Sequence, residues 1–164
     1  MMGKFKKAMF GIIYWAISLT WGALITYPGL LITLFCIIFL KGKPHKNGVT
    51  YIVEIGGNWG GLELGATALC GSYSKSQPRF YDHTRAHEFG HNIQQLVLGP
   101  LQLFLVQIPS AVRYWYGRLK GLKHPYDYAL FEYTASKYGY YWMKRLDNAF
   151  QLEYTYKRKQ SIDV

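Results

Sequence analysis

The sequence predicts an α+β domain that follows an apolar membrane segment. Residues 8–40 contain no Asp, Glu, Lys, Arg or His, and residues 50–70 carry β-branched and alternating stretches interrupted by glycines. Most later segments have the lengths and end signals of helices. Since 164 residues suffice for one compact domain beside the apolar run, we predict three parts: a membrane anchor and basic linker over 1–48, one domain over 49–150 and a polar tail over 151–164.

The apolar run exceeds the roughly 20 residues that one membrane span requires. A straight helix over 8–40 would be about 50 Å long against a hydrocarbon core of about 30 Å, so we expect a break at Tyr27-Pro28-Gly29. A hairpin, a re-entrant loop, and an interfacial helix followed by one span all remain open. A cleaved signal peptide is a further alternative, but its apolar region would be too long and no small-residue cleavage site follows.

The chain has 19 Lys and Arg residues against 9 Asp and Glu, a formal net charge of +10, and short clusters of lysine flank the apolar run. A hairpin would return the lysines at 41, 43 and 46 to the face that holds those at 4, 6 and 7, and the positive-inside rule makes that face cytoplasmic. We therefore expect the protein in the cell membrane, with anionic membrane lipid rather than nucleic acid as the partner of its charge. The two cysteines, Cys36 and Cys70, are expected to be buried and unpaired.

The predicted elements of the domain follow in order. Residues 41–48 form a linker, and residues 50–70 form two short strands around a glycine turn. A helix spans 82–98, capped by Asp82 or Thr84. The apolar segment 101–117, with a kink at Pro109, either packs under that helix or dips into the bilayer. A last helix covers 127–147.

His87-Glu88-Phe89-Gly90-His91 is an H-E-x-x-H motif. Four residues of helix advance about 400°, so both imidazoles project from one face and can bind one metal ion. Glu88 then lies beside the ion, where its carboxylate can take a proton from water activated by Zn²⁺. Given five histidines, roughly 0.005 such matches are expected by chance in this composition.

The third metal ligand must come from elsewhere, because residues 92–123 contain no Asp, Glu or His. Glu132 lies in an apolar and aromatic stretch that gives a carboxylate little other purpose, and Ala135 and Gly139 leave room for close approach of the metal helix. We expect Glu132, with His124, Asp127 and Asp147 as alternatives. His83 is expected to be a cap-region or surface histidine rather than a ligand. His45 and, if it is no ligand, His124 are expected to be solvated loop residues.

These motifs resemble the gluzincins, in which a glutamate from a later helix completes an H-E-x-x-H site, and especially the short minigluzincins. NWGGLELG, HEFGHNIQQLVLGPLQLFLVQIPSAVRYWYG and FEYTASKYG resemble a group of small bacterial membrane proteins, over about residues 55–140. The resemblance implies a minigluzincin-type α+β domain with one Zn²⁺, and a strand, here within Leu62–Cys70, that aligns an extended peptide. Gluzincins often carry Asp four residues after the ligand glutamate, whereas this chain has Ser136.

The function expected from the sequence is therefore a membrane-anchored zinc metallopeptidase that hydrolyses peptide bonds. Its metal ligands are His87, His91 and Glu132, and Glu88 is the base. Tyr138, Tyr140 and Tyr141 are candidates to stabilise the oxyanion. The rival is a non-catalytic membrane protein, a regulator or small effector, with a structural zinc site, which would need ligands but no base. A peptide or protein is the expected substrate, and no oligomeric state is predicted.

Overall fold

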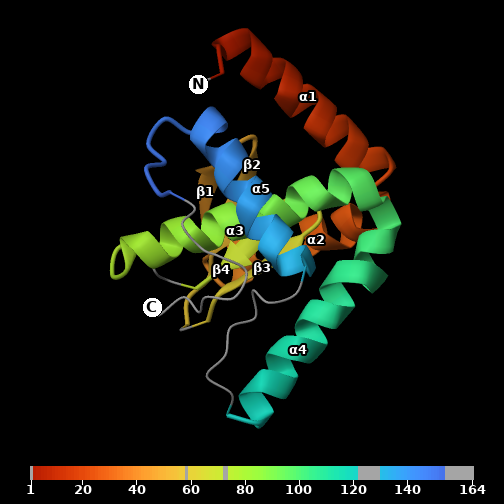
Figure 1. Cartoon of the computed structure of the whole chain (residues 1–164), viewed down its shortest axis with the longest axis vertical. Helices are drawn as coiled ribbons and strands as arrows, with labels where there is room; N and C mark the ends of the chain where they lie inside the picture. Colours follow the sequence, from red (N-terminus) through yellow and green to blue (C-terminus); the bar gives the residue numbers. More distant parts are fainter. Residues whose placement is uncertain (1, 58, 72–73, 122–129, 154–164) are drawn as a thin grey trace.

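The computed structural model describes residues 2–57, 59–71, 74–121 and 130–153. This part of the chain forms five α-helices and a four-stranded mixed sheet, so the α+β class is confirmed (Figure 1). The elements are α1 Lys4–Thr20, α2 Ala23–Phe39, β1 Lys43–Asn47, β2 Thr50–Glu54, β3 Gly61–Leu64, β4 Thr67–Cys70, α3 Pro78–Leu98, the 3₁₀-helix η1 Gly99–Leu101, the π-helix η2 Leu103–Gln107, α4 Ile108–Leu119 and α5 Leu130–Leu146.

The sheet has the strand order β1-β2-β4-β3. β2 and β4 are parallel, and the outer strands β1 and β3 pair antiparallel with them. The prediction of two strands within 50–70 is wrong, because three strands lie there and a fourth, β1, lies inside the predicted linker. β1 was not predicted because its sequence, KPHKN, has little β-propensity. Charged residues and proline are nevertheless common on edge strands.

Helices cover both faces of the sheet. Ile52, Ala68 and Cys70 face the side on which α3 contributes Tyr81, whereas their neighbours Val53 and Leu69 pack with Cys36 of α2. The order of layers is therefore α2, sheet, α3, with α5 crossing α3 on its far side (Figure 1). Cys36 and Cys70 are buried and free, as predicted.

The break in the apolar run is not where the sequence predicted it. α1 and α2 meet at an angle of 101° between Thr20 and Ala23, and Pro28 lies inside α2. Gly29 has a packing role instead, because a Cβ at this position would lie 2.1 Å from the carbonyl oxygen of Leu64. The glycine thus lets α2 approach the end of β3.

No helix within the described ranges is by itself both long and apolar enough to cross a bilayer. Two pairs of consecutive helices, each bent between its members, are long and apolar enough when the two members are counted together. The first pair is α1 with α2, and the second is Pro78–Leu101 with Leu103–Gly117, which meet at 114°.

The helix that carries H-E-x-x-H begins earlier than predicted. α3 starts at Pro78, whose fixed φ and missing N–H suit the first turn of a helix. Asp82, a predicted N-cap, instead accepts a hydrogen bond from Nε of Arg85 at 2.6 Å. α5 is described from Leu130, so the predicted helix start at 127 lies outside the described residues.

Two glycines set the distance between α3 and α5. A Cβ on Gly90 would lie 1.8 Å from the carbonyl oxygen of Ala135, and one on Gly139 would lie 1.8 Å from that of Ala86. The predicted close approach at Ala135 and Gly139 is confirmed. It matters for function because the metal-ligand candidates of α3 and α5 face each other across this contact.

We expect Gly90→Ala and Gly139→Ala each to destabilise the protein by about 1–3 kcal/mol or more, because backbone atoms rather than flexible side chains must move apart. Thermal unfolding in detergent, read beside metal content, measures the effect. Gly117→Ala in α4 is the matched control, since a Cβ there meets nothing within 4 Å. Equal unfolding temperatures for all three variants would contradict this account of the helix contact.

The apolar segment after α3 bends before Pro109 rather than at it. The chain turns through η1 and η2, and Pro109 lies in the first turn of α4. α4 then extends away from the sheet (Figure 1). The side chains of Val112, Trp115 and Leu119 are 62%, 62% and 84% exposed, so the alternative in which this segment packs under the metal helix is wrong for α4.

Candidate metal centre

The three predicted metal ligands come together in the structure. His87 and His91 lie one turn apart on α3, and Glu132 lies in the first turn of α5. Oε2 of Glu132 is 3.0 Å from Nε2 of His87 and 3.2 Å from Nε2 of His91, and the two Nε2 atoms are 3.2 Å apart. All three residues are buried, and this cluster can hold a metal ion.

The size of this triangle fits zinc. Zn²⁺ binds imidazole nitrogen and carboxylate oxygen at about 2.0–2.2 Å, so ligand atoms at the corners of a tetrahedron lie about 3.3–3.5 Å apart. The observed separations of 3.0–3.2 Å are close to that spacing. Since three protein ligands supply one face of a tetrahedron, a fourth position remains for water or substrate.

Nδ1 of each imidazole also has a hydrogen-bond partner. Nδ1 of His87 lies 2.8 Å from Oγ of Ser136, and Nδ1 of His91 lies 2.8 Å from Oε1 of Gln94. The amide nitrogen of Gln94 donates to the carbonyl of Phe131 and to Oγ1 of Thr134, so Oε1 is the atom that faces His91. His91 must then donate through Nδ1, which leaves the lone pair of Nε2 for a metal.

Ser136 lies four residues after Glu132, and its hydroxyl contacts His87. It can accept the Nδ1 proton and so fix the same tautomer, although a hydroxyl does less than a carboxylate to raise the basicity of the ring. The hydroxyl of Ser136 is thus placed to orient His87, although it is a weaker hydrogen-bond acceptor than a carboxylate would be.

Electrostatics within the cluster favour a charged carboxylate. Burial alone would raise the pKa of Glu132, but hydrogen bonds from His87 and His91 hold it well below its usual value. Before a metal binds, burial would lower the pKa of His91, yet the adjacent Glu132 raises it to about 9. A metal ion at Nε2 must therefore displace a proton from this ring. Oε1 of Glu132 accepts a hydrogen bond from the hydroxyl of Ser110, which leaves Oε2 toward the histidines.

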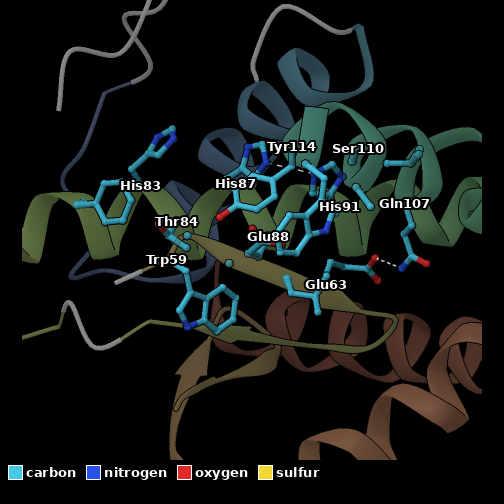
Figure 2. Close-up of a pocket in the computed structure, with 17 residues that line it drawn as sticks. Trp59, Glu63, His83, Thr84, His87, Glu88, His91, Gln107, Ser110 and Tyr114 are labelled. Atoms are coloured by element: carbon cyan, nitrogen blue, oxygen red, sulfur yellow. Dashed lines mark hydrogen bonds between the residues drawn. The ribbon is translucent and has the colours of Figure 1, made fainter. Parts of the chain in front are cut away.

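Glu88 lies beside the cluster and is not part of it. Its side chain is 5% exposed and, with His87 and His91, lines a pocket of about 610 Å³ (Figure 2). The backbone N–H of Glu63 in β3 donates to its carboxylate, and burial raises the pKa of Glu88 above the ordinary value. A buried carboxylate of raised pKa next to a metal site is suited to accept and release a proton.

The pocket has three walls. The first is strand β3 with the residues before it, the second is α3, and the third is formed by η2 and α4 (Figure 2). β3 forms the edge of the sheet on this side, whereas β4 is paired on both sides. Of the predicted peptide-aligning segment Leu62–Cys70, only the β3 portion therefore has an edge that can accept another strand.

Two histidines predicted at the surface are engaged instead. His83 is half-buried and lines the pocket, and its Nδ1 lies 2.8 Å from the hydroxyl of Tyr140. His45 lies in β1, with Nε2 3.1 Å from Oε2 of Glu54. His45 therefore lies in a strand rather than in a loop, and His83 lies within α3 rather than at its cap, because β1 and the earlier helix start were not predicted. His83 is not in the ligand cluster, as predicted. His124 lies outside the described residues.

The alternatives to Glu132 differ in outcome. Asp147 does not belong to the ligand cluster, and its Oδ2 accepts a hydrogen bond from Nη1 of Arg85 at 2.6 Å. Asp127 and His124 lie outside the described residues.

Among the three tyrosines proposed for the oxyanion, only Tyr140 is buried, and its hydroxyl contacts His83 of the pocket. Tyr138 and Tyr141 are 47% and 48% exposed, and Tyr141 lies against Arg145. Their exposure argues against the oxyanion role for both.

Four polar residues of the site were not predicted: Gln94, Ser110, Glu63 and Gln102. Gln94 follows His91 by three residues, so its contact across one helical turn was readable from spacing. Ser110 belongs to the IPS segment, where the only signal was a polar residue within an apolar run. Glu63 and Gln102 meet through tertiary structure alone.

A comparison with protein-family models finds no match for this chain, and comparisons with curated proteins and with solved structures find none either. The resemblance to the gluzincins therefore stays a prediction from the motifs.

Proposed function

We propose that this protein is a membrane-anchored zinc metallopeptidase. The observation that carries the proposal is the position of Glu88. Its buried carboxylate shares one pocket with His87 and His91 and lies beside β3, which pairs with β4 alone among the described strands. Ligands, base and a place for an extended peptide are the parts that metal-assisted peptide hydrolysis needs.

Bound zinc would supply a Lewis acid that polarises the peptide carbonyl and acidifies water. Glu88 accepts a proton from the attacking water as the carbon–oxygen bond forms. It then delivers that proton to the amide nitrogen as the carbon–nitrogen bond breaks, which releases a carboxylate and an amine. Ser136 and Gln94 hold His87 and His91 in the orientation that turns Nε2 toward the metal.

A structural zinc site is the rival. Structural sites are closed by four protein ligands, whereas only His87, His91 and Glu132 gather in the described part of the chain, beside an open pocket. This arrangement favours a catalytic role over a structural one.

Peptide hydrolysis is tested with the full-length protein purified in detergent and incubated with a peptide library. Mass spectrometry detects the new termini. We expect cleavage that a zinc chelator abolishes and that one equivalent of zinc restores. Cleavage that is indifferent to the chelator, or none from protein with a full complement of zinc, would count against the proposal.

Membrane attachment is proposed from the apolar side chains that face outward. On α1 and α2, Phe5, Ile12, Leu31 and Phe39 are 79%, 71%, 69% and 68% exposed. η2 and α4 add an outward stripe at near-helical spacing, formed by Leu105, Ile108, Val112, Tyr116 and Leu119. Bilayer contact would bury these surfaces, and the surplus of basic residues suits anionic headgroups.

We expect full-length protein to sediment with membranes after a high-salt wash and to be released by detergent. A cysteine at Lys75, an exposed position in the turn before α3, should react with an impermeant maleimide only after cells are opened. The native Cys36 and Cys70 should not react, because they are buried. Recovery in the soluble fraction would contradict membrane attachment. Labelling of intact cells would contradict the cytoplasmic orientation.

A further inference from the structure

The hydroxyl of Ser110 reaches a proposed metal ligand from the pocket wall that η2 and α4 form. Ser110 lies in the first turn of α4, is 6% exposed and lines the pocket with His87 and His91 (Figure 2). Its Oγ donates a hydrogen bond to Oε1 of Glu132. Oε2 of the same carboxylate faces Nε2 of the two histidines, at 3.0 and 3.2 Å. The two oxygens of Glu132 thus have different partners, and the partner of Oε1 comes from another helix.

The position of Ser110 is fixed by the turn that precedes it. Gln102 and Gln107 lie just before η2 and at its end, and their Nε2 atoms donate to Oε2 of Glu63 in β3 at 2.9 and 2.7 Å. Gln102 also donates to the carbonyl of His91 at 3.0 Å. Since Gln107 precedes Ser110 by three residues, this buried network holds the first turn of α4 against the sheet and the metal helix.

The partner of Oε1 matters because a carboxylate can bind a metal ion through one oxygen or through both. Catalytic zinc sites combine three protein ligands with a fourth position for water or substrate, and a second oxygen from Glu132 would compete for that position. Glu132 is fully buried, and a buried carboxylate oxygen that loses its donor is costly. Without the hydroxyl of Ser110, the bound metal would be the positive partner that Oε1 turns to.

We propose that Ser110 is a positioning residue that keeps Glu132 a one-oxygen ligand and thereby keeps the fourth position of the metal open. The inference rests on metal binding by the cluster of His87, His91 and Glu132, and it does not require that the protein cleave peptides. Because Ser110 belongs to α4, the geometry of the metal centre depends on where η2 and α4 lie. The alternative is that Ser110 only fills space beside Glu132.

Cobalt in place of zinc tests the proposal without any substrate, because the visible spectrum of Co²⁺ reports the number and arrangement of its ligands. Wild type, Ser110→Ala and Ser110→Thr are purified at full length in detergent, checked for folding by circular dichroism and loaded with Co²⁺. We expect Ser110→Thr, which keeps the hydroxyl, to have the wild-type spectrum. Ser110→Ala should keep its cobalt but have a different spectrum, because Oε1 joins the metal.

Azide, a small anion that binds metal ions directly, then probes the open position. We expect Ser110→Ala to bind azide about 10- to 100-fold more weakly than the wild type, because azide must compete with Oε1 and the difference is that of one hydrogen bond to a charged group. Ser18→Ala is the matched control. It removes a hydroxyl that is 1% exposed from α1, outside the pocket lining, and should bind azide like the wild type.

A folded Ser110→Ala protein with the wild-type spectrum and azide affinity would overturn the role of Ser110. A changed spectrum in Ser110→Thr as well as in Ser110→Ala would assign the effect to packing and would also overturn it. Wild type that takes up no Co²⁺ would overturn the metal site, and this inference with it. The peptidase proposal fails separately, since protein that shows the expected cobalt and azide results but cleaves no peptide would lose that proposal alone.

Discussion

Glu88→Gln is expected to keep its zinc and to lose peptide hydrolysis by about 100- to 10,000-fold, the usual contribution of a positioned general base. The carboxamide has nearly the same shape but cannot accept the proton of the attacking water. Metal content should not change, because Glu88 lies outside the triangle formed by His87, His91 and Glu132. Zinc content and cleavage of an identified peptide are measured on the same preparation.

Glu153→Gln is the control for this comparison, since it makes the same chemical change at an exposed ion pair with Lys144. Loss of zinc from Glu88→Gln would mean that Glu88 is a ligand or a structural residue. Full activity of the variant would refute the proposed mechanism.

Glu132→Ala is expected to lower zinc affinity about as much as His91→Ala does. Glu132 is fully buried and supplies the only negatively charged atom of the ligand triangle, so its loss leaves two neutral imidazoles and an open position on the metal. Competition with a fluorescent zinc chelator gives the affinities. Glu153→Ala should bind zinc like the wild type.

Ser136→Ala provides a reference for the loss of zinc affinity expected in Glu132→Ala. This hydroxyl touches His87 but is not one of the proposed ligands, and loss of such an outer partner typically costs about 10- to 100-fold in metal affinity. Glu132→Ala should exceed that loss. If Glu132→Ala binds zinc like the wild type, the ligand must be sought in Asp127 or His124, since Asp147 is paired with Arg85.

The three residues of the candidate metal cluster could be predicted for two reasons. Two of them follow from a short sequence motif, and the third was left after other acidic residues and histidines were excluded. The spacing of H-E-x-x-H places two imidazoles on one helix face whatever the rest of the fold. Glu132 followed from the lack of acidic residues and histidines over 92–123 and from its apolar surroundings. The small residues Ala135 and Gly139 indicated where the second helix could approach.

The partners of these residues were harder to predict because they depend on tertiary placement. Ser110 reaches Glu132 only because η1 and η2 turn the chain back toward α5, and Pro109 suggested a kink at the wrong position. Glu63 reaches the pocket only because β3 is the edge strand.

The errors in the fold have a shared cause. β1 lacks residues that favour strands and is stabilised by pairing with β2. Pro28 and Gly29 have the local chemistry of a turn, but the contact of Gly29 with Leu64 makes them part of a packed helix. In both segments, long-range contacts override local preference.

Metal analysis of the full-length wild type tests the central claim most directly. Elemental analysis of detergent-purified protein should find one zinc per chain. X-ray absorption at the zinc edge should find only nitrogen and oxygen ligands at about 2.0–2.2 Å, two of them imidazoles. Folded protein that binds no zinc, or a zinc shell that contains sulfur, would contradict a site built from His87, His91 and Glu132.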